Sequence, residues 1–256
     1  MSFLSSRMIL VLSMFFLSGA SGLIYQIVWV RMLSRLLGNT VFATSTVLAA
    51  FMAGLAIGAY AFGRFIDKKD KPLKVYAQLE IAVGIFALIL PLILNNLFPV
   101  YELVYQALGS GSTVGITVIQ VAIAFVCLLV PTIAMGATLP VLGAVVSSQA
   151  SRFGTNISLL YGVNTLGAVV GTLASGFFLI GVFGEWATVI IGVSVNLLVG
   201  LMAYYYSNMH EGNTAPSIEP SDVPSSSDEG RVSPYPSYVR YVVVSVFMVS
   251  GFVALG

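Results

Sequence analysis

The chain is almost continuously apolar from Met1 to Tyr206, and this feature constrains its fold more than any other. Runs of about 20 or more mostly uncharged residues are separated there by short polar turns. A hydrocarbon core about 30 Å thick is crossed by about 20 residues of helix. The sequence therefore predicts six membrane spans, and the lipid bilayer is the first partner that we expect.

All six spans should be helices, because an isolated strand leaves its backbone polar groups unpaired in lipid. We expect them at about Met8–Val30, Phe42–Phe62, Val75–Leu94, Val114–Leu142, Ile157–Val182 and Trp186–Tyr206. The predicted fold class is thus an all-α polytopic membrane helix bundle over residues 1–206.

The composition changes after this bundle. Residues 207–237 are rich in proline, serine and acidic side chains, so they cannot bury enough apolar surface to offset chain entropy. We expect a disordered linker there, and the start of a seventh transmembrane helix, belonging to a second bundle, at residues 238–256. Val243–Gly251 repeats the pattern of Val11–Gly19, which fits the start of a second bundle.

Composition excludes several classes of function. Only 8% of residues are charged, against roughly 25% in soluble domains, and the net charge of +1 gives no reason to expect nucleic acid. Cys127 and His210 are the single cysteine and the single histidine, so no disulfide, zinc site or histidine-based triad is available. No glycine-rich nucleotide loop follows a strand pattern. We therefore assign no catalytic residue, metal ligand or cofactor.

The placement of lysine and arginine predicts the orientation. With the N-terminus in the cytoplasm, nine of the 11 basic residues lie on cytoplasmic segments and only Arg31 and Arg35 lie outside. We therefore expect a multi-pass inner-membrane protein whose N-terminus and linker are cytoplasmic.

The loop after the second span, GRFIDKKDKP, resembles the loop between the second and third helices of major facilitator transporters. That pattern has a second glycine and a final basic residue where this chain has Asp70 and Pro72. In the family these charges hold one gated state; the alternative is an ordinary cytoplasmic loop. The positions that fit are Gly63, Asp67, Lys68 and Lys71.

Small residues recur every four positions in two spans, as Ala50, Gly54 and Gly58 and again as Gly167, Gly171 and Ser175. Such stripes favour close helix packing over ligand binding.

The first and fourth spans also contain residues that interrupt helices, and breaks at equivalent positions of two repeats point to a transport site. Simple kinking is the alternative. The residues are Gly19, Gly22, Pro131, Gly136 and Pro140.

Glu80 is the only carboxylate well inside a predicted span. Burial of a lone carboxylate is costly, so Glu80 should face the bundle interior and bind a proton or cation, or else hydrogen-bond to a neighbour. We expect the substrate or ion pathway to be lined by Tyr25, Gln26, Tyr161 and Asn164. Interhelical hydrogen bonds are the simpler role for these groups, as for Asn196. Trp29 beside Arg31 is typical of an interfacial anchor.

Five strings in order resemble the membrane part of the fused major-facilitator/spermidine synthase family. They are FFLSGASGLIYQIVWVRMLSRLLGNT, STVLAAFMAGLAIGAYAFGRFID, YAQLEIAVGIFALILP, PTIAMGATLPVL and LLYGVNTLGAVVGTLASGFFLI. The resemblance implies the N-terminal half of a transporter-like bundle, joined to a soluble aminopropyltransferase-like domain. That domain would bind decarboxylated S-adenosylmethionine and a polyamine, and its catalytic residues have no matching positions here.

Three functions follow from this resemblance. The first is a transporter-like membrane domain that handles polyamines or related small cationic metabolites, completed by the chain's own missing C-terminal half. The second is a membrane anchor for a spermidine synthase domain absent from this chain. The third is a structural bundle that transports nothing.

Overall fold

The computed structural model describes residues 6–66, 69–96, 99, 102, 106, 113–146 and 153–210. No strand occurs among these residues, so the predicted all-α class is confirmed for them. The helices are α1 (Ser6–Leu37), α2 (Thr40–Phe65), α3 (Pro72–Asn96), α5 (Thr113–Val146), α6 (Phe153–Ala174), η3 (Ser175–Leu179, a π-helical turn) and α7 (Ile180–His210).

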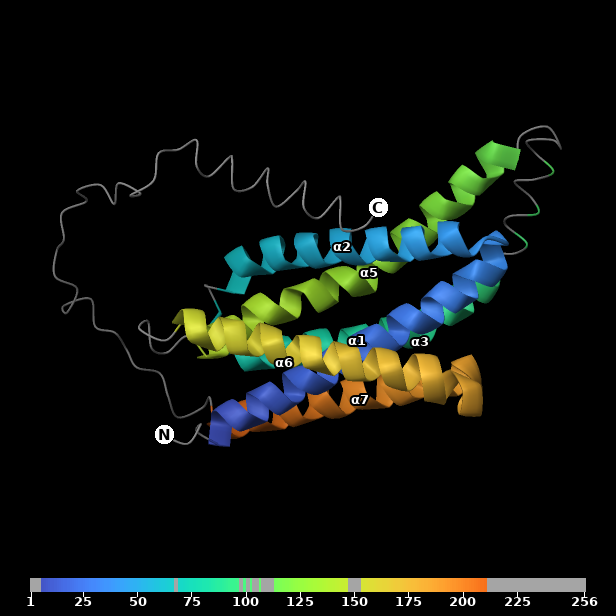
Figure 1. Cartoon of the computed structure of the whole chain (residues 1–256). Coiled ribbons are helices and arrows are strands. Elements are labelled where there is room, and N and C mark those ends of the chain that lie inside the picture. The colour runs from blue at the N-terminus through green and yellow to red at the C-terminus, as the bar shows by residue number, and fades with distance from the viewer. Residues whose placement is uncertain are drawn as a thin grey trace, which may run out of the picture. The chain divides into compact units, whose positions relative to one another are not determined.

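Five segments of the described chain are long and apolar enough to cross a membrane, rather than the six predicted. The fifth, Gly154–Met209, is 56 residues long because α6, η3 and α7 follow one another without a loop. Gly184 interrupts it with φ 78° and ψ 174°, a left-handed conformation that glycine adopts without strain. Figure 1 shows the chain turning back near the start of α7. Residues 211–256, which hold most of the predicted linker and the seventh apolar run, lie outside the described residues.

Helix pairing follows the small-residue stripes. The most extensive contacts join α2 to α5 and α1 to α6, while α3 packs on α7 and α5 (Figure 1). A Cβ atom on Gly58 would lie 2.0 Å from the carbonyl oxygen of Ile133, and one on Gly54 would meet Thr132. Thr132 also donates to the carbonyl oxygen of Ala50, 3.2 Å away. The predicted packing role of this stripe is confirmed.

The second stripe packs α6 against α1. A Cβ atom on Gly167 would lie 2.0 Å from the carbonyl oxygen of Phe16, and one on Gly171 would lie 2.1 Å from that of Ala20. The backbones therefore approach too closely for any side chain at these two positions. The packing role predicted for this stripe is confirmed as well.

The expected helix interruptions in the first and fourth spans do not appear as breaks, because α1 and α5 are each continuous. Gly19 and Gly136 serve instead as sites of close helix approach, to Asn164 and Leu55 respectively, and Gly22 faces Met135. The prolines lie inside α5, which bends along its length in Figure 1. The alternative of kinking therefore fits α5. The prolines concerned are Pro131 and Pro140.

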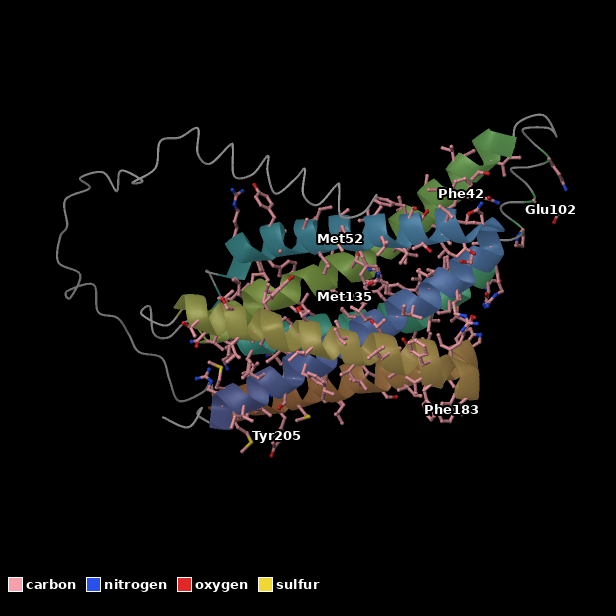
Figure 2. The ribbon with its side chains drawn as sticks, in the orientation of Figure 1. Phe42, Met52, Glu102, Met135, Phe183 and Tyr205 are labelled. Carbon is pink, nitrogen blue, oxygen red and sulfur yellow. The ribbon has the colours of Figure 1, made fainter. Side chains whose placement is uncertain are left out.

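Large apolar side chains cover the outside of the bundle. Phe42, Met52, Phe183 and Tyr205, labelled in Figure 2, are all exposed. A soluble protein rarely leaves apolar patches of this extent in water. The exposed surface therefore suits a hydrocarbon surrounding, in agreement with the length of the helices.

Candidate functional site

Glu80 forms the polar centre of the bundle. Its side chain is 0% exposed in the first half of α3, and it joins three helices. Oε1 accepts a hydrogen bond from Ser18 Oγ of α1 at 2.6 Å, and Oε2 accepts one from Asn196 Nδ2 of α7 at 2.6 Å. Within the described residues, no basic side chain forms an ion pair with Glu80. The carboxylate is therefore held by neutral donors alone.

Tyr25 extends this network. Its hydroxyl donates to Asn196 Oδ1 at 3.0 Å, and both side chains are buried. The ring fits between Trp29, stacked with a centroid separation of 5.6 Å, and Gly192 of α7. A Cβ atom on Gly192 would lie 2.7 Å from Tyr25 Cε1, so the absence of a side chain makes room for the ring.

Tyr76 lies one helical turn before Glu80 on α3. Its fully buried hydroxyl lies within hydrogen-bonding reach of Glu80 and Ser18, although neither contact has standard geometry. A further neutral hydroxyl therefore lies next to the carboxylate. We refer to Ser18, Tyr25, Tyr76, Glu80 and Asn196 as the Glu80 cluster.

Helical spacing explains part of this cluster. Ser18 and Tyr25 are seven residues apart on α1, and Tyr76 and Glu80 are four apart on α3, so each pair shares a helix face. Tyr25 and Glu80 were predicted at the site, and the interhelical hydrogen bond predicted for Asn196 is confirmed. Ser18 and Tyr76 were not predicted, although their spacing from Tyr25 and Glu80 was available as a signal.

The other predicted pathway residues lie elsewhere. Tyr161 on α6 is 63% exposed on the outer surface. Asn164 is half-buried and packs against Gly19, and Gln26 is half-buried on α1. No hydrogen bond found among the described residues joins these three side chains to the Glu80 cluster. That these side chains share a pathway with Glu80 stays a prediction.

The predicted gating loop is only partly described. Gly63 is half-buried near the end of α2, and Lys71 is exposed just before α3, where its carbonyl oxygen accepts from the backbone of Lys74 and Val75. Asp67 and Lys68 lie outside the described residues. The latch that the motif predicts remains a prediction.

An ion-pair cluster joins α1 to α7 immediately after the turn at Gly184. Glu185 pairs with Arg35 through both carboxylate oxygens, and with Arg31 at 3.8 Å. The interpretation of Trp29 beside Arg31 as an interfacial anchor is wrong, because Trp29 is fully buried against Tyr25 and Phe51. Arg31 itself, by contrast, is exposed.

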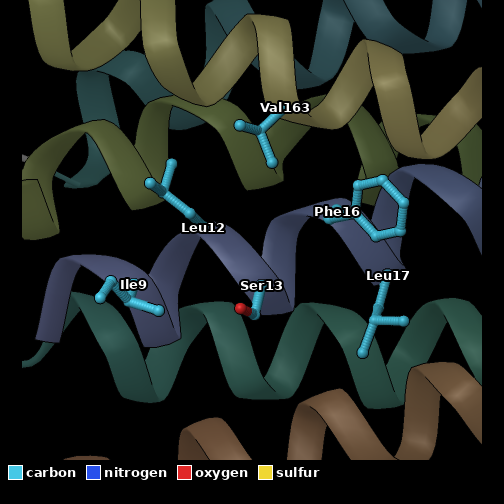
Figure 3. A pocket seen from close by; sticks show the side chains of 6 residues that line it. All are labelled: Ile9, Leu12, Ser13, Phe16, Leu17 and Val163. Atoms are coloured by element: carbon cyan, nitrogen blue, oxygen red, sulfur yellow. The ribbon is translucent and has the colours of Figure 1, made fainter. Parts of the chain in front are cut away.

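A groove of about 490 Å³ lies on α1 beside α6 (Figure 3). Its one hydroxyl comes from Ser13, and the remaining lining is apolar: Ile9, Leu12, Phe16, Leu17 and Val163. No member of the Glu80 cluster lines it. Glu80 itself is fully buried, and the groove on α1 suits apolar contents.

The chain, a helical bundle with a buried carboxylate, is distantly similar to two known proteins. No family model and no solved structure matches the chain. It is 23% identical over 202 residues to polyamine aminopropyltransferase 1 of Streptomyces coelicolor, a match that covers 78% of this chain and 34% of the relative. It is 27% identical over 187 residues to a polyamine aminopropyltransferase of Corynebacterium efficiens, covering 71% and 32%.

The chain thus spans about a third of the length of the curated relatives that it matches. The spermidine synthase side of the predicted resemblance is supported by these relatives. The major-facilitator side finds no support among them.

Proposed function

We propose that the chain is the transporter-like membrane domain of a spermidine synthase-like protein, and that it handles polyamines or related cationic metabolites. In this proposal the turn at Gly184 divides the longest apolar segment into two, so that the bundle crosses the membrane six times. The N-terminus and the end of α7 then lie in the cytoplasm.

The observation that carries this proposal is the buried, unpaired carboxylate of Glu80. Polyamines are cations, and a cation in a low-dielectric interior requires an anionic partner or a compensating proton movement. Among the described acidic residues, Asp70 and Glu102 are exposed and Glu185 pairs with arginines, so Glu80 is the one available within the bundle. The two relatives are named polyamine aminopropyltransferases, which supports a polyamine as the substrate class.

The test is uptake of labelled putrescine and spermidine by proteoliposomes that contain the purified chain. We expect Glu80→Gln to lose at least about tenfold in rate, equivalent to about 1.4 kcal/mol, while the matched Glu102→Gln variant on an exposed position keeps the wild-type rate. Uptake that survives Glu80→Gln with its pH dependence unchanged would remove Glu80 from the mechanism. Wild-type vesicles without uptake would contradict transport by this chain.

The proposed orientation has its own test. Cys127 is the one native cysteine, so Lys71→Cys in a Cys127→Ser background provides a single labelling site. We expect a membrane-impermeant maleimide to label this site in inverted vesicles and not in intact cells. Labelling in intact cells would place this loop outside and reverse the topology.

A second candidate function is a membrane anchor for an aminopropyltransferase domain. The relatives' names and the coverage of only about a third of their length favour it. Its test is aminopropyl transfer by the longest natural polypeptide that contains this chain. An anchor predicts transfer activity at the membrane that Glu80→Gln leaves unchanged, together with an absence of polyamine uptake. A structural bundle predicts neither activity.

A further inference from the structure

The hydrogen bonds that link Glu80, Asn196 and Tyr25 can run in either direction, with donor and acceptor exchanged. In the direction described above, Ser18 and Asn196 donate to an ionised carboxylate, and Tyr25 donates to Asn196. Amide and hydroxyl side chains carry both donors and acceptors, and a protonated carboxyl group gains one donor. The same groups can therefore be joined around a protonated Glu80 if the Asn196 amide rotates by half a turn.

We propose that Glu80 is a proton-binding site, and that protonation reverses the hydrogen bonds of Asn196 and Tyr25. The proton adds to Oε2, which then donates to Asn196 Oδ1 in place of accepting from Nδ2. Asn196 Nδ2 in turn donates to Tyr25 Oη. This proposal names the ion that the site binds. It rests on the proposed function only for the role of the proton in transport.

The geometry allows this reversal without movement of the helices. The two contacts of Asn196 are 2.6 Å to Glu80 and 3.0 Å to Tyr25, and the oxygen and nitrogen of an amide are nearly equal in size. The side chains of Tyr25, Glu80 and Asn196 are all buried, so water does not compete for these bonds. Both of the Asn196 links are kept in either state.

The surroundings of Glu80 leave its protonation free to change. The titratable groups that face it are Tyr25 from α1 and Tyr76 from α3 itself. On the packed helices α5 and α7, the titratable residues are Cys127, which packs against the apolar cluster that includes Tyr25, and groups toward the two ends of α7. No described cation pairs with Glu80 to keep it ionised. The hydroxyl of Tyr76, within reach of Glu80, can donate to the carboxylate or accept from the acid.

The same geometry disfavours a metal cation. A metal ion needs converging oxygen lone pairs, whereas Ser18 and Asn196 point donors at Glu80. In the part of the chain that the structure describes, no three His, Cys, Asp or Glu side chains gather in one place.

The experiment is infrared difference spectroscopy of the purified chain in nanodiscs, titrated between about pH 4 and about pH 10. We compare the wild type with Glu80→Gln and with Tyr25→Phe, which lacks only the hydroxyl. The expected result is a protonated-carboxyl band on acidification that is lost in Glu80→Gln. A phenol C–O band should shift with the same midpoint in the wild type and should be lost in Tyr25→Phe.

Three results would overturn the proposal. The first is a wild-type spectrum without a carboxyl band beyond those of Glu80→Gln, since Glu80 would then bind no proton. The second is a Glu80 band that titrates while the Tyr25 band stays fixed, since the network would then not reverse. The third is stabilisation against heat by sodium ions, at constant pH, in the wild type but not in Glu80→Gln.

A second variant covers the case in which Glu80→Gln does not fold. Asn196→Leu should raise the midpoint of the carboxyl band by about one pH unit, because hydrogen bonds to a charged acceptor are the stronger ones. An unchanged midpoint would show that Asn196 does not govern Glu80. These spectra need no uptake, so a failure of polyamine transport with a titrating Glu80 would refute the proposed function alone.

Discussion

The contact between α2 and α5 at Gly58 gives the sharpest prediction of stability. A Cβ atom there would lie 2.0 Å from the carbonyl oxygen of Ile133 and 2.9 Å from the backbone nitrogen of Ala137, whereas ordinary contact begins at 3.4 Å. Both obstacles are backbone atoms, so no side-chain rotation relieves them. Gly58→Ala therefore requires the two helices to separate by more than about 1 Å.

The expected cost follows from two opposing effects. Overpacking of this kind destabilises by about 1–3 kcal/mol, and the better helix propensity of alanine returns at most about 1 kcal/mol. With a central cost of about 2 kcal/mol, the net loss should be about 1–2 kcal/mol, which lowers the midpoint of thermal unfolding by about 2–8 °C in a domain of this size.

Gly162 on α6 provides the matched control, because nothing lies within 4 Å of its Cβ position. Gly162→Ala should leave the midpoint unchanged or raise it slightly. The assay is thermal unfolding in detergent micelles, followed by far-ultraviolet circular dichroism. A wild-type midpoint for Gly58→Ala, or an equal loss in both variants, would refute the close approach of α2 and α5.

Other predictions concern the polar groups. Asn196→Leu removes the link from α7 to Glu80 and should destabilise the bundle to chemical unfolding by about 1–2 kcal/mol; an unaffected variant would contradict the buried network. Glu185→Gln removes an ion pair whose arginines are largely exposed, so its cost should stay below about 1 kcal/mol and vanish in high salt; a larger, salt-independent loss would argue against a surface pair. Tyr161→Phe should leave stability unchanged, because the side chain is exposed. A drop in polyamine uptake would place this hydroxyl on a pathway outside the bundle, whereas unaltered uptake would exclude the hydroxyl from the pathway.

Several elements of the fold could be predicted because they depend on local pattern. Hydropathy places the helices, since a run of apolar residues in lipid has no alternative to a helix. The stripe through Gly54 and Gly58 predicts close packing because glycine at every fourth position forms a flat helix face. The number of spans was harder to predict from hydropathy. The apolar segment from Gly154 to Met209 is interrupted only by the non-helical Gly184.

The site was predictable only in part. Glu80 stands out because a carboxylate within an apolar run must be buried or paired, and its burial follows from that cost. The partners of Glu80 do not stand out, because Ser18 and Asn196 resemble many other polar residues in these helices. Trp29 was misassigned for a related reason: tryptophan favours membrane interfaces on average, and this one stacks on Tyr25 in the interior.

By itself, the sequence determined that these segments are helices and that they suit a lipid surrounding. It also determined that the charge of Glu80 must be neutralised or hydrogen-bonded inside the bundle. Each of these properties depends on residues within one helix and on the solvent around it. The tertiary structure alone decided that Tyr25, Asn196 and Glu80 form one chain of hydrogen bonds, and that Tyr161 faces outward. The physical reason is that a local pattern can mark one face of a helix, whereas packing between distant segments decides which helix that face meets.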